Sequence, residues 1–256
     1  MQRKILSRFD HLFVQDEASR KLIEEIGLGN ICSVSGDTRF DRVSEIANGF
    51  QPIPHIREFT GENKTIVAGS TWPDDEEVLQ KAFNHLNDPR LKLIIAPHEI
   101  NAKHLDEIQL LFKNSVRYST LTNRGMQDDA RILIIDNIGL LSRLYYYADI
   151  AYVGGGLRKS GIHNVLEAAV FDKVILFGPN YKKYREATGL VQSGGAIPFY
   201  DEKRDGLMLS QLIQALLLVP ADRSQRARVA GEFVRKRQGA TQTILRFIQE
   251  KRLLTS

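Results

Sequence analysis

The residues best placed to do chemistry follow short apolar runs, where the strands of a parallel sheet would end. Glycines occupy positions 154–156, directly after the apolar run 150–153. A polar and basic loop leads to His163 and Asn164, where a helix is expected to begin, and Glu167 comes one turn later. Glycine has no Cβ to keep an anion away from the main chain, and backbone amides at such a turn and helix start can bind one. The segment therefore predicts a nucleotide site, with Glu167 facing a sugar attached to the bound phosphate.

Three further segments place polar residues after expected strands. Ser70 and Thr71 follow the run 65–68, and Pro97 and His98 follow the run 91–96. Ligands of open α/β sheets bind at the carboxyl ends of the strands, so these side chains are candidates for contacts with a phosphate or a substrate carboxylate. The alternatives are a helix-capping turn for Ser70 and Thr71 and an exposed or structural histidine for His98.

Arg39 is a further candidate, because it follows the expected strand 31–35 in the sequence Gly-Asp-Thr-Arg-Phe-Asp. The functional interpretation is a cation that points into a cleft beside the main sheet. The alternative is a capped turn with a surface arginine.

The elements that would position these residues alternate between short apolar runs and longer helical patterns. This alternation predicts an α/β fold, a Rossmann-like parallel sheet with helices on both faces. The expected strands are 11–15, 31–35, 65–68, 91–96, 132–135, 149–153, 174–177 and 196–199. The expected helices are 17–26, 74–86, 102–113, 140–147, 164–171, 182–191, 206–218 and 222–251.

The segment 48–63 has two prolines, two glycines and no clean period, which is typical of a linker. The 47 residues before it hold too few elements to bury a core by themselves. Residues 1–47 therefore either add to the main sheet or are the remnant of a larger, preceding domain. We expect residues 64–221 to form the nucleotide-binding domain and residues 222–256 to form a basic C-terminal helix.

Composition and charge limit the classes of protein. The chain of 256 residues is 43% hydrophobic and 26% charged, and no window resembles a membrane-spanning helix or a signal peptide. A single cysteine, Cys32, excludes an internal disulfide and fits a reducing compartment such as the cytoplasm. From Asp222 onward nine Lys or Arg oppose three acids. This tail is either a solvated helix face or a surface for an anionic membrane, and it lacks the interleaved aromatic residues of a nucleic-acid surface.

Several kinds of active site have no signature in the sequence. The histidines lack metal-ligand spacing, and neither a Walker-type phosphate loop nor a GxSxG nucleophile motif occurs. The glycines at 154–156 also miss the GxGxxG spacing of a dinucleotide site, which disfavours a nicotinamide enzyme. We expect no metal site.

Four sequence segments together resemble one family. SGDTRFDRV, AGSTW, APHE and VGGGL…GIHNVLEAA…FGP are similar, in order, to the C-terminal half of 3-deoxy-D-manno-octulosonic acid (Kdo) transferases. These are GT-B glycosyltransferases that move Kdo from CMP-Kdo onto the lipid A precursor. The resemblance covers roughly residues 9–199 and implies the C-terminal domain of a GT-B fold.

The resemblance also implies site roles. Gly155, Gly156 and the helix start at His163 and Asn164 would hold the donor phosphate, and Glu167 would bind the ribose. Arg39, Ser70, Thr71, Pro97 and His98 would line the phosphate and sugar of CMP-Kdo, and no other cofactor is implied.

In this family a glutamate of the N-terminal domain is the general base, and no glutamate here matches it. We therefore expect this chain to bind CMP-Kdo without transferring Kdo. The acceptor, lipid A precursor, would be bound by the N-terminal domain, at the cytoplasmic face of the bacterial inner membrane. Two alternatives remain open: another sugar-nucleotide GT-B enzyme, either a UDP-sugar transferase or an epimerase, and a non-catalytic nucleotide-binding or membrane-surface scaffold.

Overall fold

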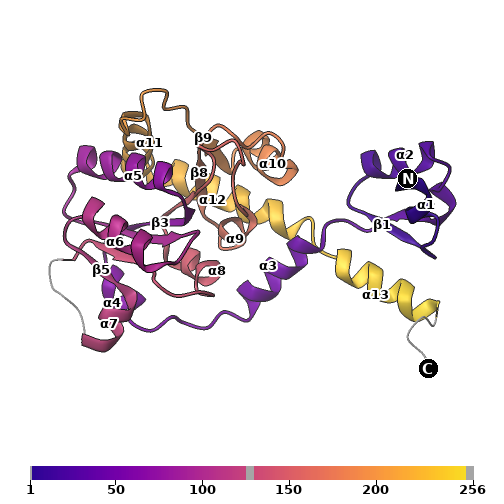
Figure 1. Ribbon diagram of the computed structural model, residues 1–256, viewed down its shortest axis with the longest axis horizontal. Helices are drawn as coiled ribbons and strands as arrows, with labels where there is room; N and C mark the ends of the chain where they lie inside the picture. Colours follow the sequence, from indigo (N-terminus) through magenta and orange to yellow (C-terminus); the bar gives the residue numbers. More distant parts are fainter. Residues whose placement is uncertain (1, 125–129, 252–256) are drawn as a thin grey trace. The chain divides into compact units, whose positions relative to one another are not determined.

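The computed structural model describes residues 2–124 and 130–251 (Figure 1). Contacts within the chain define two compact units, Met1–Glu45 with Val234–Ser256, and Ile46–Phe233. The larger unit contains every candidate site residue except Arg39, which lies in the smaller one.

The larger unit is built on a seven-stranded parallel sheet with the strand order β5-β6-β4-β3-β7-β8-β9. Its strands are β3 (Lys64–Thr71), β4 (Leu91–Pro97), β5 (Ser115–Arg117), β6 (Ile132–Ile134), β7 (Ile150–Val153), β8 (Val174–Phe177) and β9 (Ala196–Pro198). Strands β4, β6, β7 and β8 are buried along their whole length, as expected of strands covered on both faces.

Helices cover both faces of this sheet. They are α4 (Ile56–Thr60), α5 (Pro73–Leu86), α6 (Ala102–Leu111), α7 (Tyr118–Arg124), α8 (Leu141–Leu144), α9 (Leu166–Ala169), α10 (Arg185–Ser193), α11 (Leu207–Leu218) and α12 (Pro220–Arg235), with a 3₁₀ turn η2 (Tyr145–Tyr147). On one face α5 and α11 lie side by side (Figure 1). On the other, Leu141 and Tyr145 pack so tightly that a Cβ on Gly69 of β3 would lie 2.2 Å from the Tyr145 hydroxyl.

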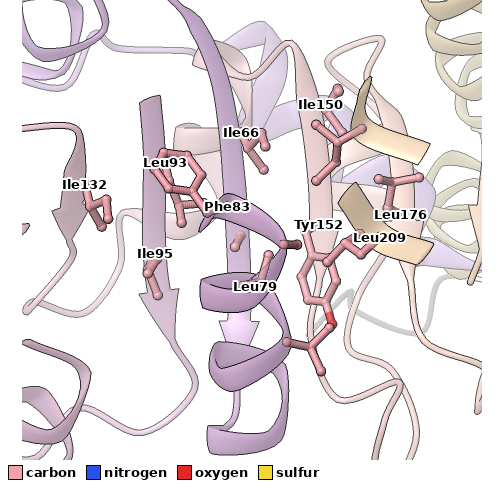
Figure 2. Packing of buried hydrophobic residues seen from close by; sticks show 14 of the residues in the cluster. Ile66, Leu79, Phe83, Leu93, Ile95, Ile132, Ile150, Tyr152, Leu176 and Leu209 are labelled. Atoms are coloured by element: carbon pink, nitrogen blue, oxygen red, sulfur yellow. The ribbon is translucent and has the colours of Figure 1, made fainter. Parts of the chain in front are cut away.

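The main core lies between the sheet and helices α5, α6 and α11. Alternate strand residues such as Ile66, Leu93 and Tyr152 point to this face, where Leu79 and Phe83 of α5 pack against the sheet (Figure 2). This layer fixes the position of α5, whose first turn adjoins the carboxyl end of β3.

The smaller unit holds two parallel strands, β1 (Leu12–Val14) and β2 (Cys32–Val34). Its helices are α1 (Gln2–Leu6), α2 (Glu17–Glu25) and α13 (Ala240–Glu250), with a 3₁₀ turn η1 (Gly29–Ile31). Helix α3 (Thr38–Asn48) begins in this unit, and the boundary between the units falls after its residue Glu45. The rings of His11, Phe13 and Phe247 contact one another, so α13 packs on β1.

The predicted parallel sheet and the eight predicted strands are present. Strand β5 was not predicted, because three residues between two helices give too short a pattern. The single helix predicted for 222–251 is wrong: α12 ends at Arg235, α13 begins at Ala240, and Gly239 between them has a φ of 113°. A left-handed residue of this kind interrupts a helix.

The segment 48–63 contains α4 and contributes Ile53, Ile56 and Phe59 to the interior of the larger unit. The domain boundaries expected from the sequence stay a prediction. Among the described residues, no helix is both long and apolar enough to cross a bilayer.

Candidate functional site

The candidate site lies where strands β3 and β7 run side by side. Ile66 to Gly69 of β3 pair with Ile150 to Val153 of β7. Beyond β3 the chain continues to β4 on one side, and beyond β7 it continues to β8 on the other. Connections that leave two adjacent strands in opposite directions open a crevice at their carboxyl ends, and ligands of such sheets bind there.

The two strand ends approach each other unusually closely. A Cβ on Gly154 would lie 2.2 Å from the Ser70 carbonyl oxygen, so only glycine fits there. Ser70 itself has a φ of 52°, and the register of β3 against β4 shifts between Gly69 and Thr71. This left-handed residue turns the chain at the crevice, where strain in a non-glycine residue often accompanies function.

A buried carboxylate, Asp75, ties the glycine turn to the start of α5. Its Oδ2 accepts hydrogen bonds from the backbone N–H of Gly155 (2.8 Å) and of Trp72 (3.0 Å), and its Oδ1 accepts from the Tyr152 hydroxyl (2.7 Å). Burial raises the pKa of the Asp75 carboxyl, while these three hydrogen bonds act in the opposite direction. The arrangement holds the turn in one conformation.

The glycines of the turn have different tasks. Gly155 has a φ of 87°, and its N–H is already bonded to Asp75. A Cβ on Gly156 would lie 2.6 Å from the backbone nitrogen of Gly178, so this glycine lets the turn pack against the chain after β8. Within the described residues the N–H of Gly156 donates to no acceptor.

Helix α9 begins beside this turn. The His163 N–H donates to the Gly154 carbonyl (3.1 Å), and Asn164 Oδ1 accepts from the Leu166 N–H (3.1 Å). In the part of the chain that the structure describes, the N–H groups of Asn164 and Val165 have no acceptor. Because α9 has only four residues, free amides rather than a long helix dipole make this end attractive to an anion.

Glu167 is held by its neighbour on the same turn. Asn164 Nδ2 donates to Glu167 Oε1 over 3.1 Å. Burial raises the pKa of the Glu167 carboxyl, and the Asn164 hydrogen bond partly offsets this. A half-buried carboxylate with one oxygen left for further donors suits the recognition of hydroxyl groups.

Aromatic and cationic side chains cluster at the mouth of the crevice. The Trp72 ring lies 4.6 Å from the His98 ring, and the His98 ring lies 4.3 Å from the His163 ring, measured between centroids. Trp72 Nε1 donates to His163 Nε2 over 2.9 Å, and the Arg158 guanidinium lies 4.0 Å from the centre of the Trp72 ring. These groups bring hydrogen-bond donors and one positive charge to this side of the crevice, where an anion would be favoured.

A cavity of about 270 Å³ adjoins these residues. Its wall combines polar Ser70, His98 and Asn137 with apolar Pro97 and Ile135. The remaining lining residues are Ala96, Ile100, Ile138, Gly139 and Leu141. A cavity that is mostly apolar with a few polar groups is typical of small-molecule sites.

The structure brings together most of the residues predicted from the sequence. Ser70, Pro97 and His98 line the cavity, and Gly155, Gly156, His163, Asn164 and Glu167 form the adjacent turn and helix start. Two candidates have other surroundings. The Thr71 side chain is fully buried, and its hydroxyl donates to Glu76. Arg39, in the smaller unit, is paired with Asp37 over 2.7 Å. The donor contacts predicted for both stay predictions.

Sequence reasoning missed the residues that support the site from behind. Asp75 was predicted only as part of an acidic helix start, although it is fully buried. Glu76, also buried, accepts from Thr71 and lies 2.9 Å from His104 Nε2. The available signal was the density of acids after Pro73, since four consecutive carboxylates exceed what a helix start needs.

Comparison with known proteins shows which proteins the chain is similar to. No family model matches the chain. A 3-deoxy-D-manno-octulosonic acid transferase from Rickettsia typhi is 26% identical over 201 residues, which make up 75% of this chain and 42% of that protein. Kdo transferases from other Rickettsia species and from Chlamydia trachomatis match at similar identity. The chain is a homologue of Kdo transferases. It spans half or less of the length of these relatives.

Solved structures share the fold of this chain. The C-terminal CMP-Kdo-binding domain of WaaA from Acinetobacter baumannii has a TM-score of 0.60 at 20% identity, covering 77% of this chain and 99% of that chain. A UDP-N-acetylglucosamine 2-epimerase has a TM-score of 0.60 at 15% identity, covering 96% of this chain and 59% of the epimerase. These likenesses confirm the predicted fold class, an α/β fold that matches the C-terminal domains of GT-B glycosyltransferases.

Proposed function

We propose that this chain binds CMP-Kdo and supplies the donor-binding part of a Kdo transferase. The observation that carries the proposal is the convergence of Ser70, His98, the glycine turn and Glu167 at the β3–β7 crevice. The homology to Kdo transferases and the fold shared with a CMP-Kdo-binding domain support the choice of donor.

Each part of the donor has a matching group in the crevice. The phosphate would bind the unpaired amides of Gly156, Asn164 and Val165, with His163 as a further donor. Arg158 would contribute its positive charge from the face of Trp72. Amides that are already fixed in place stabilise the charge that develops on the CMP phosphate as it leaves, without reorganisation.

The nucleoside would occupy the other half of the site. Glu167 would accept hydrogen bonds from the two ribose hydroxyls. The cytosine would enter the cavity between Pro97 and Ile135, where the Asn137 side chain can form hydrogen bonds with the polar edge of the base. Ser70 and His98, at the border of the cavity and the phosphate side, would contact the sugar. Thr71 would support the site indirectly, because its buried hydroxyl donates a hydrogen bond to Glu76.

The complete reaction would transfer Kdo to the lipid A precursor in lipopolysaccharide biosynthesis, with inversion at the anomeric carbon. A carboxylate acting as general base would remove the proton of the acceptor hydroxyl, which attacks as CMP departs. In this proposal residues 64–221 hold the donor, and the acceptor and the general base belong to another part of the enzyme. The basic residues after Asp222 would favour an anionic membrane surface, such as the cytoplasmic face of the inner membrane.

The test measures the melting temperature of the chain in the presence of different nucleotides. CMP is expected to raise the melting temperature of the chain, while UDP and UDP-N-acetylglucosamine at the same concentration leave it nearly unchanged. Glu167→Ala should abolish the CMP shift, and the exposed control Glu62→Ala should keep it. Stabilisation by UDP but not by CMP would favour a UDP-sugar transferase or epimerase instead. An unchanged CMP shift in Glu167→Ala would remove the proposed ribose contact and favour a scaffold role.

A further inference from the structure

The hydrogen bond between Trp72 and His163 determines which nitrogen of His163 carries its proton. Indole Nε1 is a donor only, so the 2.9 Å contact requires His163 Nε2 to accept. A nitrogen that accepts has no proton of its own. The neutral imidazole must therefore be protonated at Nδ1.

The donor in this contact is itself firmly held. The backbone N–H of Trp72 donates to Asp75 Oδ2 over 3.0 Å. Trp72 directly precedes Pro73, the first residue of α5. The Arg158 guanidinium lies over the indole face at 4.0 Å. An indole fixed at its backbone and covered on one face keeps its N–H pointed at His163.

The opposite nitrogen of His163 is free to bind a ligand. Within the described residues, no group bonds to His163 Nδ1, and this atom is not fully buried. It is therefore accessible to solvent. The backbone of the same residue is bonded to the glycine turn through Gly154. Burial, reinforced by the nearby His98, lowers the pKa of His163 and so favours the neutral ring.

We propose that Trp72 is a positioning residue that holds His163 as the Nδ1–H tautomer, so that His163 offers a neutral hydrogen-bond donor to the phosphoryl group of the donor nucleotide. The ligand named here rests on the proposed function, whereas the tautomer assignment does not. Without the indole N–H the ring would divide between two tautomers, and only one of them could donate from Nδ1. The apparent affinity for the anion would then decrease in proportion to the fraction of rings in the competent tautomer.

The first measurement is the ¹⁵N NMR spectrum of the histidine side chains in the ligand-free chain. In the wild type, His163 Nδ1 is expected at a protonated and Nε2 at an unprotonated chemical shift. In Trp72→Phe, which keeps an aromatic ring but removes the N–H, both nitrogens are expected at intermediate shifts. A wild-type His163 protonated at Nε2 would overturn the proposal whether or not the chain binds CMP.

The second measurement is the dissociation constant for CMP, determined by titration calorimetry. Trp72→Phe is expected to raise it about three- to five-fold, the loss that follows when roughly a quarter of the rings stay competent. In a His163→Ala background the same substitution should add nothing, because Trp72 acts through His163. An equal loss in both backgrounds would show that Trp72 acts independently of His163 and would overturn the proposal.

The matched control is Tyr184→Phe. It removes another aromatic donor, the Tyr184 hydroxyl, which bonds to the carbonyl of Ser160, three residues before His163, over 2.8 Å. This variant should keep the wild-type His163 tautomer and CMP affinity. If wild-type CMP binding is absent, the proposed function fails, while the NMR result still decides the tautomer.

Discussion

The backbone N–H of Gly155 donates to Oδ2 of Asp75 over 2.8 Å, although the two residues are 80 positions apart in the chain. The same carboxylate accepts hydrogen bonds from the backbone N–H of Trp72 and from the Tyr152 hydroxyl. One buried side chain therefore connects the start of α5, the strand β7 and the glycine turn. The geometry of the glycine turn depends on it.

Asp75→Asn is expected to destabilise the chain strongly. An amide keeps only one acceptor oxygen, so at least one of the three donors loses its partner inside the protein. The cost is about 2–3 kcal/mol of unfolding free energy, since an unsatisfied buried donor carries most of its desolvation penalty. Urea denaturation followed by circular dichroism would measure it.

Asp74→Asn is the matched control, because Asp74 is the adjacent acid and pairs with Arg204 at the surface. Its loss should cost under about 1 kcal/mol, as is usual for exposed ion pairs. Equal destabilisation by the two substitutions would contradict the role assigned to Asp75.

The contrast between these two acids shows what the sequence left undetermined. Asp74 and Asp75 both fit an acidic helix start, and local pattern treats them alike. Only the sheet, by placing Tyr152 and Gly155 above α5, makes one of them a buried acceptor. Contacts between residues this far apart have no signature in local sequence.

Gly154→Ala is expected to disrupt the β3–β7 edge. The added methyl group would lie 2.2 Å from the Ser70 carbonyl oxygen, and backbone atoms on both sides cannot yield without moving a strand. Overpacking of this kind costs about 1–3 kcal/mol or more. A melting curve, together with the loss of the CMP-induced shift, would report it.

Gly194→Ala separates this steric clash from ordinary glycine strain. Gly194 ends α10 with a φ of 89°, and a Cβ there would meet nothing within 4 Å. It should cost only about 1 kcal/mol, from the left-handed backbone alone, and should leave the CMP-induced shift intact. A smaller cost for Gly154→Ala than for Gly194→Ala would argue against the close approach of the two strands.

Glu167→Gln is expected to stabilise the ligand-free chain at neutral pH while weakening CMP binding. Burial raises the pKa of Glu167 in the folded chain, so folding favours its protonated form. The contribution of this group to stability is therefore fully present below its ordinary pKa and is lost as the pH rises through the raised value. Glutamine keeps an acceptor for Asn164 without the charge. At pH values above the raised pKa, the substitution should therefore increase the free energy of unfolding by up to about 1 kcal/mol.

The measurement for Glu167→Gln is the pH dependence of urea unfolding for both proteins. The two stability curves should meet at acid pH and separate as the pH rises. Curves that stay parallel, or a glutamine variant that is less stable at neutral pH, would contradict the assigned burial of the charge.

Asp41→Asn is expected to show the opposite pH dependence, in the smaller unit. Burial opposes ionisation of Asp41, but its hydrogen bonds to the N–H groups of Gly239 and Thr241 outweigh this and lower its pKa. The stabilisation is present above the ordinary pKa and is lost as the pH falls through the lowered one. Near neutral pH the substitution should therefore reduce amide-exchange protection in α13 by about 1 kcal/mol, the usual value of a helix cap. An effect that persists unchanged at strongly acid pH would contradict the ionised cap.

The sequence predicted the sheet well because its strands are buried apolar runs, such as Val174–Phe177, which is followed by a glycine and a proline. It failed after Asp222, where one continuous helical pattern concealed a break. The break lies at the left-handed Gly239, and Asp41, about 200 residues earlier, caps the start of α13 that follows it. The open face of the site was predicted from strand ends, whereas Asp75 and the orientation of His163 required the folded chain.

The most direct test of the central claim is a crystal structure of the chain with CMP. The account predicts the phosphate within hydrogen-bonding distance of the Gly156 and Asn164 amides, the ribose hydroxyls on Glu167, and the cytosine in the cavity beside Pro97. CMP bound elsewhere on the chain, or a crevice that stays empty at saturating CMP, would contradict it.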